Sequence, residues 1–227
     1  MILSIETSTF FCSVALHNQG RLLAEVQLQV PQATASQLSV MINQVSVLTG
    51  IKPGQLEAIA VSSGPGSYTG LRIGVATAKG LCFGLGIPLI AVGSLPLLVQ
   101  QVMPFNSNQH WLCPMLDARR MEVYTQLFNA SGQAQSEVHA LVVDESSYKE
   151  ALDRQPILFF GNGAGKCRDT IRHPHAIFLS DVQPSAGKLG ELAFQKFVLR
   201  AFEDVASFEP FYLKEFIAKK PKTGHVC

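Results

Sequence analysis

The stretch "VSSGPGSYTGLRIGVATAKGL", residues 61–81, places a short apolar run, a glycine-rich turn and a helix-like segment in succession. It fails three motif tests. A P-loop ends in Gly-Lys-Ser/Thr, a dinucleotide-binding loop has glycines at its first, third and sixth positions, and a nucleophile elbow has glycines two residues before and after its serine. What remains is a tight strand-to-helix turn, with Ser67 or Thr69 as the N-cap of a helix over residues 69–84.

The composition is that of a globular protein with a large apolar interior. Of the 227 residues, 47% are hydrophobic and 15% are charged, and the formal net charge is +1, which disfavours a dedicated nucleic-acid-binding protein. The five cysteines form no Cys-x-x-Cys pair, so we expect reduced thiols in a cytoplasmic protein. The N-terminus has no basic leader and is interrupted by Glu6, which predicts neither a signal peptide nor a membrane span.

The hydrophobic periodicity of the first half predicts the element order β-β-β-α-β-α-β. Apolar residues alternate or run together in the predicted strands and recur with helical spacing in the predicted helices. The predicted strands are residues 2–6, 12–16, 22–30, 57–61 and 87–92, and the predicted helices are residues 33–48 and 69–84.

The second half repeats this pattern. Its first apolar run ends at Asp117, as the first run of the chain ends at Glu6. The interval from Glu6 to His17 equals that from Asp117 to Phe128, so we expect the two hairpins to share one register. The segment "ILFFGNGAG" (157–165) parallels "IAVSSGPGS" (59–67), which predicts a second helix after the Gly-x-Gly turn.

A duplicated unit of this kind, with an acid at the end of each first strand, is typical of the ribonuclease-H-like or actin-like (ASKHA) α/β fold. We expect an N-terminal half over residues 1–104 and a C-terminal half over residues 105–227. A final helix is predicted near residues 185–203, and the join lies near residues 95–108.

Four residues are candidates for cofactor binding, because this fold places phosphates between its two hairpins. They are Glu6, Asp117, Gly161 and Gly163. For the two acids we favour the alternative that each accepts a hydrogen bond from an amide at its strand end. Lys166 does not have Walker spacing, so we favour a solvated lysine over a phosphate contact.

Several segments resemble the bacterial TsaB (YeaZ) family, and the resemblance runs along essentially the whole chain. They are "IETSTFFCSVAL" (5–16), "SSGPGSYTGLRIGVATAKGL" (62–81), "GNGA" (161–164) and "FEPFYLKEF" (208–216). The resemblance implies the actin-like fold and a role in the threonylcarbamoyl modification of tRNA adenosine beside the anticodon. It implies a non-catalytic subunit that pairs with a TsaD-like transferase, is joined by a TsaE-like ATPase, and meets tRNA through the complex. ATP or ADP would then be used through the complex, with no cofactor held firmly by this chain.

The distribution of histidines agrees with a non-catalytic role. The resemblance implies that the transferase paralogue holds its metal with two histidines, spaced i and i+4, on the first long helix. Here that helix, within "PQATASQLSVMINQVSVLTG" (31–50), has no histidine, so we expect no metal site. His173 and His175 flank a proline and are expected to be solvated. Glu6 departs from the aspartate that many members of the fold carry.

The helix after the glycine turn is apolar nearly all round, so it must be covered on both faces. Its small residues Gly70, Gly74, Ala78 and Gly80 would admit another helix. We expect helices 33–48 and 69–84 to pair with the TsaD-like partner or, when the chain is alone, with a second copy. The expected interface residues are Leu38, Met41, Ile42, Val45, Leu71, Arg72, Val75, Ala78 and Lys79.

Two other functions remain as alternatives. One is a stand-alone actin-like ATP-dependent phosphotransferase that uses Glu6 and Asp117. The other is a serine peptidase at Ser67, although no histidine lies near it in sequence and a capping role is favoured. In the tail, Lys219, Lys220 and Lys222 are expected to solubilise the chain rather than to contact tRNA.

Overall fold

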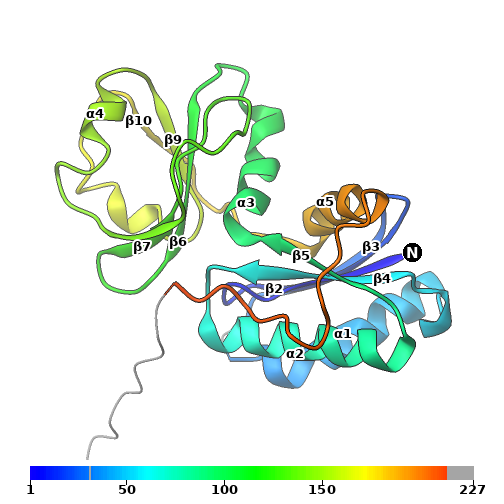
Figure 1. Ribbon diagram of the computed structural model, residues 1–227. Helices are drawn as coiled ribbons and strands as arrows, with labels where there is room; N and C mark the ends of the chain where they lie inside the picture. The colour runs from blue at the N-terminus through cyan, green and yellow to red at the C-terminus, as the bar shows by residue number, and fades with distance from the viewer. Residues whose placement is uncertain (31, 214–227) are drawn as a thin grey trace, which may run out of the picture.

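The computed structural model describes residues 1–30 and 32–213, which form two lobes, each built on a five-stranded sheet (Figure 1). The first sheet has the order β3-β2-β1-β4-β5 and the second, read the same way, the order β8-β7-β6-β9-β10. The strands of the first sheet are β1 (Ile2–Glu6), β2 (Cys12–Asn18), β3 (Arg21–Leu28), β4 (Ala58–Gly64) and β5 (Leu89–Gly93). Those of the second are β6 (Trp111–Asp117), β7 (Glu122–Thr125), β8 (His139–Val142), β9 (Ile157–Phe160) and β10 (Ala176–Phe178).

Both sheets have the same pairing pattern. Three antiparallel strands, β1–β3 or β6–β8, are extended by two parallel strands on the far side of the first. The predicted duplicated actin-like α/β fold is therefore confirmed. The hairpin registers differ by one residue, because Glu6 lies opposite Ser13 whereas Asp117 lies opposite Val123. The expectation of a shared register was wrong, since the loop after β6 is one residue shorter than the loop after β1.

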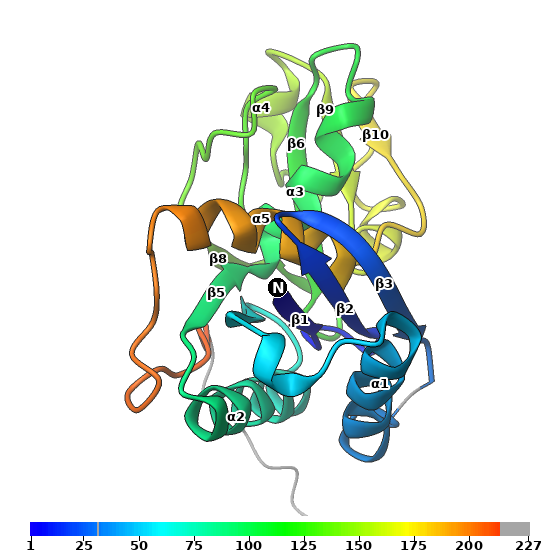
Figure 2. The same cartoon turned by 90° about the vertical axis from the view of Figure 1, so that its right-hand side faces the viewer.

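Within the described part of the chain, three helices cover the first sheet. The helices α1 (Thr34–Thr49) and α2 (Tyr68–Leu85) lie on one face, and α5 (Ala186–Val198) lies on the other (Figure 2). The predicted helices 33–48 and 69–84 are thus confirmed to within a residue at each end. A hydrophobic core lies between these two helices, α1 and α2, and the sheet, and it includes Ile5, Val14 and Val61.

The helix α5 comes from the second half of the sequence but packs on the sheet of the first. Its Leu189 and Ala193 share a buried cluster with strand residues such as Ile90. The buried His17 of β2 donates from Nε2–H to the carbonyl of Gly187 at 2.8 Å, and burial lowers the pKa of His17, which keeps the ring neutral. A Cβ at Gly190 would lie 2.0 Å from His17 Nδ1, so only glycine permits this close approach.

The helix α3 (Ser94–Val102) follows β5, in the region expected to be only a join. Its Leu95 and Leu98 pack with Leu112 and Phe160 of the second sheet, so α3 connects the two lobes. The second half is otherwise poor in helix. Where a helix was expected after its Gly-x-Gly turn, the structure has only the 3₁₀ turn η3 (Gly165–Cys167). The second half also has the short helix α4 (Lys149–Leu152). Two further 3₁₀ turns, η1 (Pro53–Gln55) and η2 (Met103–Phe105), lie in the preceding part of the chain.

Candidate functional site

A cleft of about 450 Å³ lies between the lobes, where the loops after β1, β4 and β6 meet. The first lobe contributes hydroxyl groups and an aromatic ring from the loop after β1 and the turn before α2. The second lobe contributes the end of β6 and the hairpin turn after it. The lining residues are Ser8, Thr9, Phe10, Gly66, Ser67, Tyr68, Thr69, Leu116, Asp117, Ala118, Arg119, Tyr124 and Asn162.

The glycine-rich turn is held against the loop after β1. Ser67 Oγ accepts a hydrogen bond from the amide of Gly70 at 3.2 Å, which confirms Ser67 as the N-cap of α2. The Ser67 amide donates to the carbonyl of Ser8 at 2.6 Å. A Cβ at Gly66 would lie 2.2 Å from that carbonyl, and a Cβ at Gly70 would lie 2.1 Å from the carbonyl of Thr7. These glycines therefore allow the helix start to pack directly on the loop.

Glu6 is fully buried and is not among the described residues that line the cleft. Its Oε1 accepts a hydrogen bond from the amide of Ser8 at 2.6 Å, while the buried Oε2 has no hydrogen-bond partner in the described part of the chain. Burial raises the pKa of Glu6 to about 7, because a carboxylate without water is disfavoured relative to the neutral acid. The predicted hydrogen bond to a strand-end amide is confirmed.

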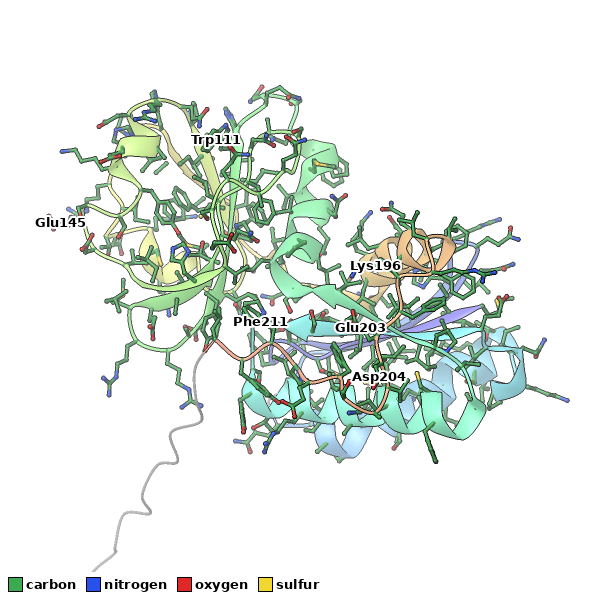
Figure 3. All side chains as sticks on the ribbon, in the orientation of Figure 1. Trp111, Glu145, Lys196, Glu203, Asp204 and Phe211 are labelled. Carbon is green, nitrogen blue, oxygen red and sulfur yellow. The ribbon has the colours of Figure 1, made fainter. Side chains whose placement is uncertain are left out.

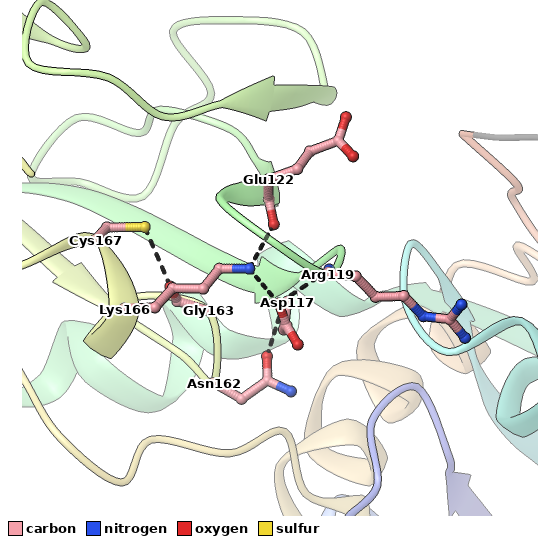
Figure 4. A network of polar contacts seen from close by, with 7 residues as sticks. All are labelled: Asp117, Arg119, Glu122, Asn162, Gly163, Lys166 and Cys167. Carbon is pink, nitrogen blue, oxygen red and sulfur yellow. Dashed lines mark hydrogen bonds and ion pairs between the residues drawn. The ribbon is translucent and has the colours of Figure 1, made fainter.

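Asp117 occupies the equivalent place at the end of β6 but is partly exposed (Figure 4). Its Oδ1 accepts from the amide of Arg119 at 3.0 Å, which confirms the prediction for the second acid. The same oxygen forms an ion pair with Lys166, whose ammonium also donates to the carbonyl of Glu122 at 2.7 Å. The expectation of a solvated Lys166 was wrong, since this side chain is 25% exposed and is held by Asp117.

Gly161 and Gly163 lie against the end of β6. A Cβ at Gly161 would come within 2.4 Å of the carbonyl of Met115, and one at Gly163 within 2.9 Å of the amide of Asp117. Between them, Asn162 accepts from the same Asp117 amide at 2.9 Å (Figure 4). The two glycines thus position the amide side chain that lines the cleft.

Most of the expected interface residues face the chain's own core. The side chains of six of the nine are at most 4% exposed, so they are not surface contacts for a partner: Leu38, Met41, Val45, Leu71, Val75 and Ala78. Ile42 is partly buried, and only Arg72 is classed as exposed. Gly74 packs on Thr7 rather than on another helix, whereas a Cβ at Gly80 would meet nothing within 4 Å.

The second face of α2 is covered by residues 203–213, here called the C-terminal strap (Figure 3). The sequence pattern did not predict that this segment packs on α2. The Glu203 amide donates to the carbonyl of Leu89, and the Phe211 amide donates to that of Ser63 at 2.7 Å. Phe208 packs against the first core. Lys79 of α2 donates to two strap carbonyls, those of Ala206 at 3.1 Å and Phe208 at 2.9 Å. The strap therefore covers much of the apolar surface of α2 that does not face the sheet.

The outward faces of α1 and α2 still carry large apolar side chains. Phe83 of α2 is 87% exposed, and Val47 and Leu48 of α1 are 72% and 70% exposed. The helices that carry these exposed side chains, α1 and α2, lie on the same face of the first sheet (Figure 2).

The remaining sequence expectations concern histidines, cysteines and the tail. His173 Nε2 lies 3.3 Å from Asp153 Oδ1, and His175 Nδ1 lies 2.7 Å from the carbonyl of Leu152, so the pair is held by the protein rather than left in solvent.

Within residues 1–30 and 32–213, no three His, Cys, Asp or Glu side chains are grouped as metal ligands. Four cysteines in the same ranges are free and buried. No helix in that part is long and apolar enough to cross a membrane. The tail lysines lie outside the described residues.

Comparison with known proteins links this architecture to tRNA modification. A family model described as TsaD, tRNA N6-adenosine threonylcarbamoyltransferase, matches residues 29–219. The chain is 32% identical over 196 residues to the tRNA threonylcarbamoyladenosine biosynthesis protein TsaB of Bacillus subtilis (strain 168), covering 85% of this chain and 80% of that relative. It is 29% identical over 229 residues to the protein of the same name in Escherichia coli (strain K12), with 98% of each covered.

A solved structure has a fold similar to that of this chain. YeaZ from Pseudomonas aeruginosa superimposes with a TM-score of 0.80 at 27% sequence identity, covering 93% of this chain and 99% of that one.

Proposed function

The chain belongs to the TsaB (YeaZ) family of tRNA threonylcarbamoyladenosine biosynthesis proteins, and from this premise we propose that it is a non-catalytic subunit that binds and activates a TsaD-like transferase. The observation that carries the proposal is the apolar face of α1 and α2, where Val47, Leu48 and Phe83 remain exposed after the chain has folded. Large apolar side chains gathered on one face of a globular protein mark an interaction surface.

The match to the TsaD family model supports a partner of related fold. Two paralogues with equivalent helices pair through a quasi-twofold bundle, because each then offers the other a matching surface. A second copy of the chain occupies the same face when the partner is absent. The TsaE-like ATPase joins this pair, and tRNA and ATP or ADP are engaged by the assembled complex.

The residues of the chain do not fit a metal-dependent transferase. The helix α1, which would carry the i and i+4 histidine pair, has none between Thr34 and Thr49. A structural and activating role is therefore supported over a catalytic one.

The two alternative functions have less support. A phosphotransferase would need two free carboxylates in the cleft. Glu6 is buried and is not among the described residues that line the cleft, and Asp117, which does line it, is paired with Lys166. A serine peptidase would need a base beside Ser67, whose oxygen caps α2 instead, and no histidine is among the described residues that line the cleft.

Sedimentation of the purified chain with the TsaD-like protein of the same host tests the proposal. A charge on this apolar face would be desolvated and unpaired in the complex, which costs about 2–5 kcal/mol of association. We expect Phe83→Glu to raise the dissociation constant at least about 30-fold. Val142→Glu is the matched control, because Val142 is 66% exposed but lies on β8 of the second lobe. Equal affinities of the two variants would contradict the proposed surface.

A further inference from the structure

A second cavity, of about 660 Å³, shares none of the described residues that line the cleft, and the proposed function makes no use of it. It is bounded by the end of β3, the last turn of α3 with η2, and the segment that leads into α5. Four of its lining residues are glutamines: Gln27, Gln29, Gln101 and Gln183. The described residues that line it include no lysine, arginine or histidine.

Two of these glutamines have unsatisfied acceptors. The side-chain oxygens of Gln101 and Gln183 are both buried and have no hydrogen-bond partner within residues 1–30 and 32–213. A buried carbonyl oxygen without a donor destabilises the folded state, and it can only accept. Both residues line the cavity, so a ligand there that supplies N–H groups would satisfy these acceptors.

The same cavity contains an unpaired negative charge. Asp181 is exposed, and in the described part of the chain it has neither an ion pair nor a side-chain hydrogen bond. Its backbone has φ of 62°, a conformation that aspartate and asparagine tolerate better than most residues. Because no basic side chain is among the described residues that line the cavity, Asp181 makes the cavity attractive to a cation.

Aromatic side chains complete the site. Phe105 of η2 is 84% exposed, an unusual state for a phenylalanine, and Phe11 is partly buried at the same cavity. A planar cation stacks on such rings, whereas a compact and strongly hydrated ammonium group does so less readily.

We propose that this cavity binds an arginine side chain of a partner protein. A guanidinium group is planar, permanently charged and weakly hydrated, and it presents five N–H donors. It would donate to Gln101 and Gln183, pair with Asp181 and stack on Phe105. A nucleic acid is disfavoured, because its phosphates would meet a carboxylate and, among the described lining residues, no basic side chain.

The test is an NMR titration of the isotopically labelled full chain with the peptide acetyl-Gly-Arg-Gly-amide. We expect saturable shifts in the side-chain amide signals of Gln101 and Gln183 and in the backbone signal of Asp181. The peptide acetyl-Gly-Lys-Gly-amide should bind several-fold more weakly. Asp181→Asn should raise the dissociation constant of the arginine peptide about tenfold, since it removes one charge-assisted contact.

Glu145→Gln is the matched control, because Glu145 is an exposed acid that does not line this cavity (Figure 3). It should leave the dissociation constant unchanged, as should Phe83→Glu, which affects the proposed partner face only. The inference is overturned if no saturable shift appears or if the lysine peptide binds equally well. It is also overturned if Glu145→Gln weakens binding as much as Asp181→Asn, or if adenosine shifts these signals and the arginine peptide does not.

Discussion

Replacing Gly70 with alanine tests the idea that the glycines of the turn serve close packing. The new Cβ would lie 2.1 Å from the Thr7 carbonyl oxygen, whereas real Cβ contacts are almost never shorter than 3.0 Å. The start of α2 or the loop after β1 must therefore move by about 0.9 Å. Overpacking of this kind costs about 1–3 kcal/mol, and the clash is with backbone, which favours the upper end. Alanine recovers about 1 kcal/mol through its helix propensity.

The net loss of unfolding free energy for Gly70→Ala is then about 2 kcal/mol, or about 4–8 °C in the thermal midpoint of a chain of this length. Gly80→Ala is the control, because Gly80 lies in the same helix and its Cβ would meet nothing within 4 Å. It should raise the midpoint by about 2–4 °C. Far-UV circular dichroism during heating measures both. The reasoning is refuted if Gly70→Ala is as stable as Gly80→Ala.

Three further substitutions test other parts of the structure. The folded chain keeps the Glu6 proton between pH 4.5 and about 7, where the unfolded chain has released it, so stability falls as pH rises through this window. Glu6→Gln should be about 3 kcal/mol more stable than the parent at pH 8 and equal to it at pH 4.5 by urea denaturation; a constant difference across this range would contradict the assignment. Lys79→Met removes both hydrogen bonds to the strap, and amide hydrogen exchange at Glu203 should accelerate while that of β1 is unchanged; equal rates at Glu203 would show that Lys79 does not hold the strap. Val75→Glu buries a charge in the first core and should abolish folding by circular dichroism, whereas a folded variant would place Val75 at the surface.

The local elements of the fold could be predicted because their signals are local. The strands β1, β4 and β5 are largely apolar and almost entirely buried, as expected of strands covered on both faces. The N-cap at Ser67 and the hydrogen bonds from strand-end amides to Glu6 and Asp117 depend on residues within three positions. Each needs only a short sequence window.

The arrangement of distant segments could not be predicted in the same way. The strap has no periodicity, and its contact with Lys79 joins residues 127 and 129 positions apart. Because the sequence does not reveal this contact, it predicts that a partner covers the outer apolar surface of α2. It therefore places Val75 and Ala78 at an interface, whereas both are buried in the core. The ion pair of Lys166 with Asp117 was likewise missed, because it depends on how β6 and β9 align.

The central claim is that the chain supports tRNA modification by binding a TsaD-like partner through α1 and α2. The most direct test is to deplete the chain in its host and to measure threonylcarbamoyladenosine in tRNA by nucleoside mass spectrometry. We predict that the modification falls, that the parent chain and Val142→Glu restore it, and that the double variant Val47→Glu and Phe83→Glu does not. Unchanged modification after depletion, or full restoration by the double variant, would contradict the account.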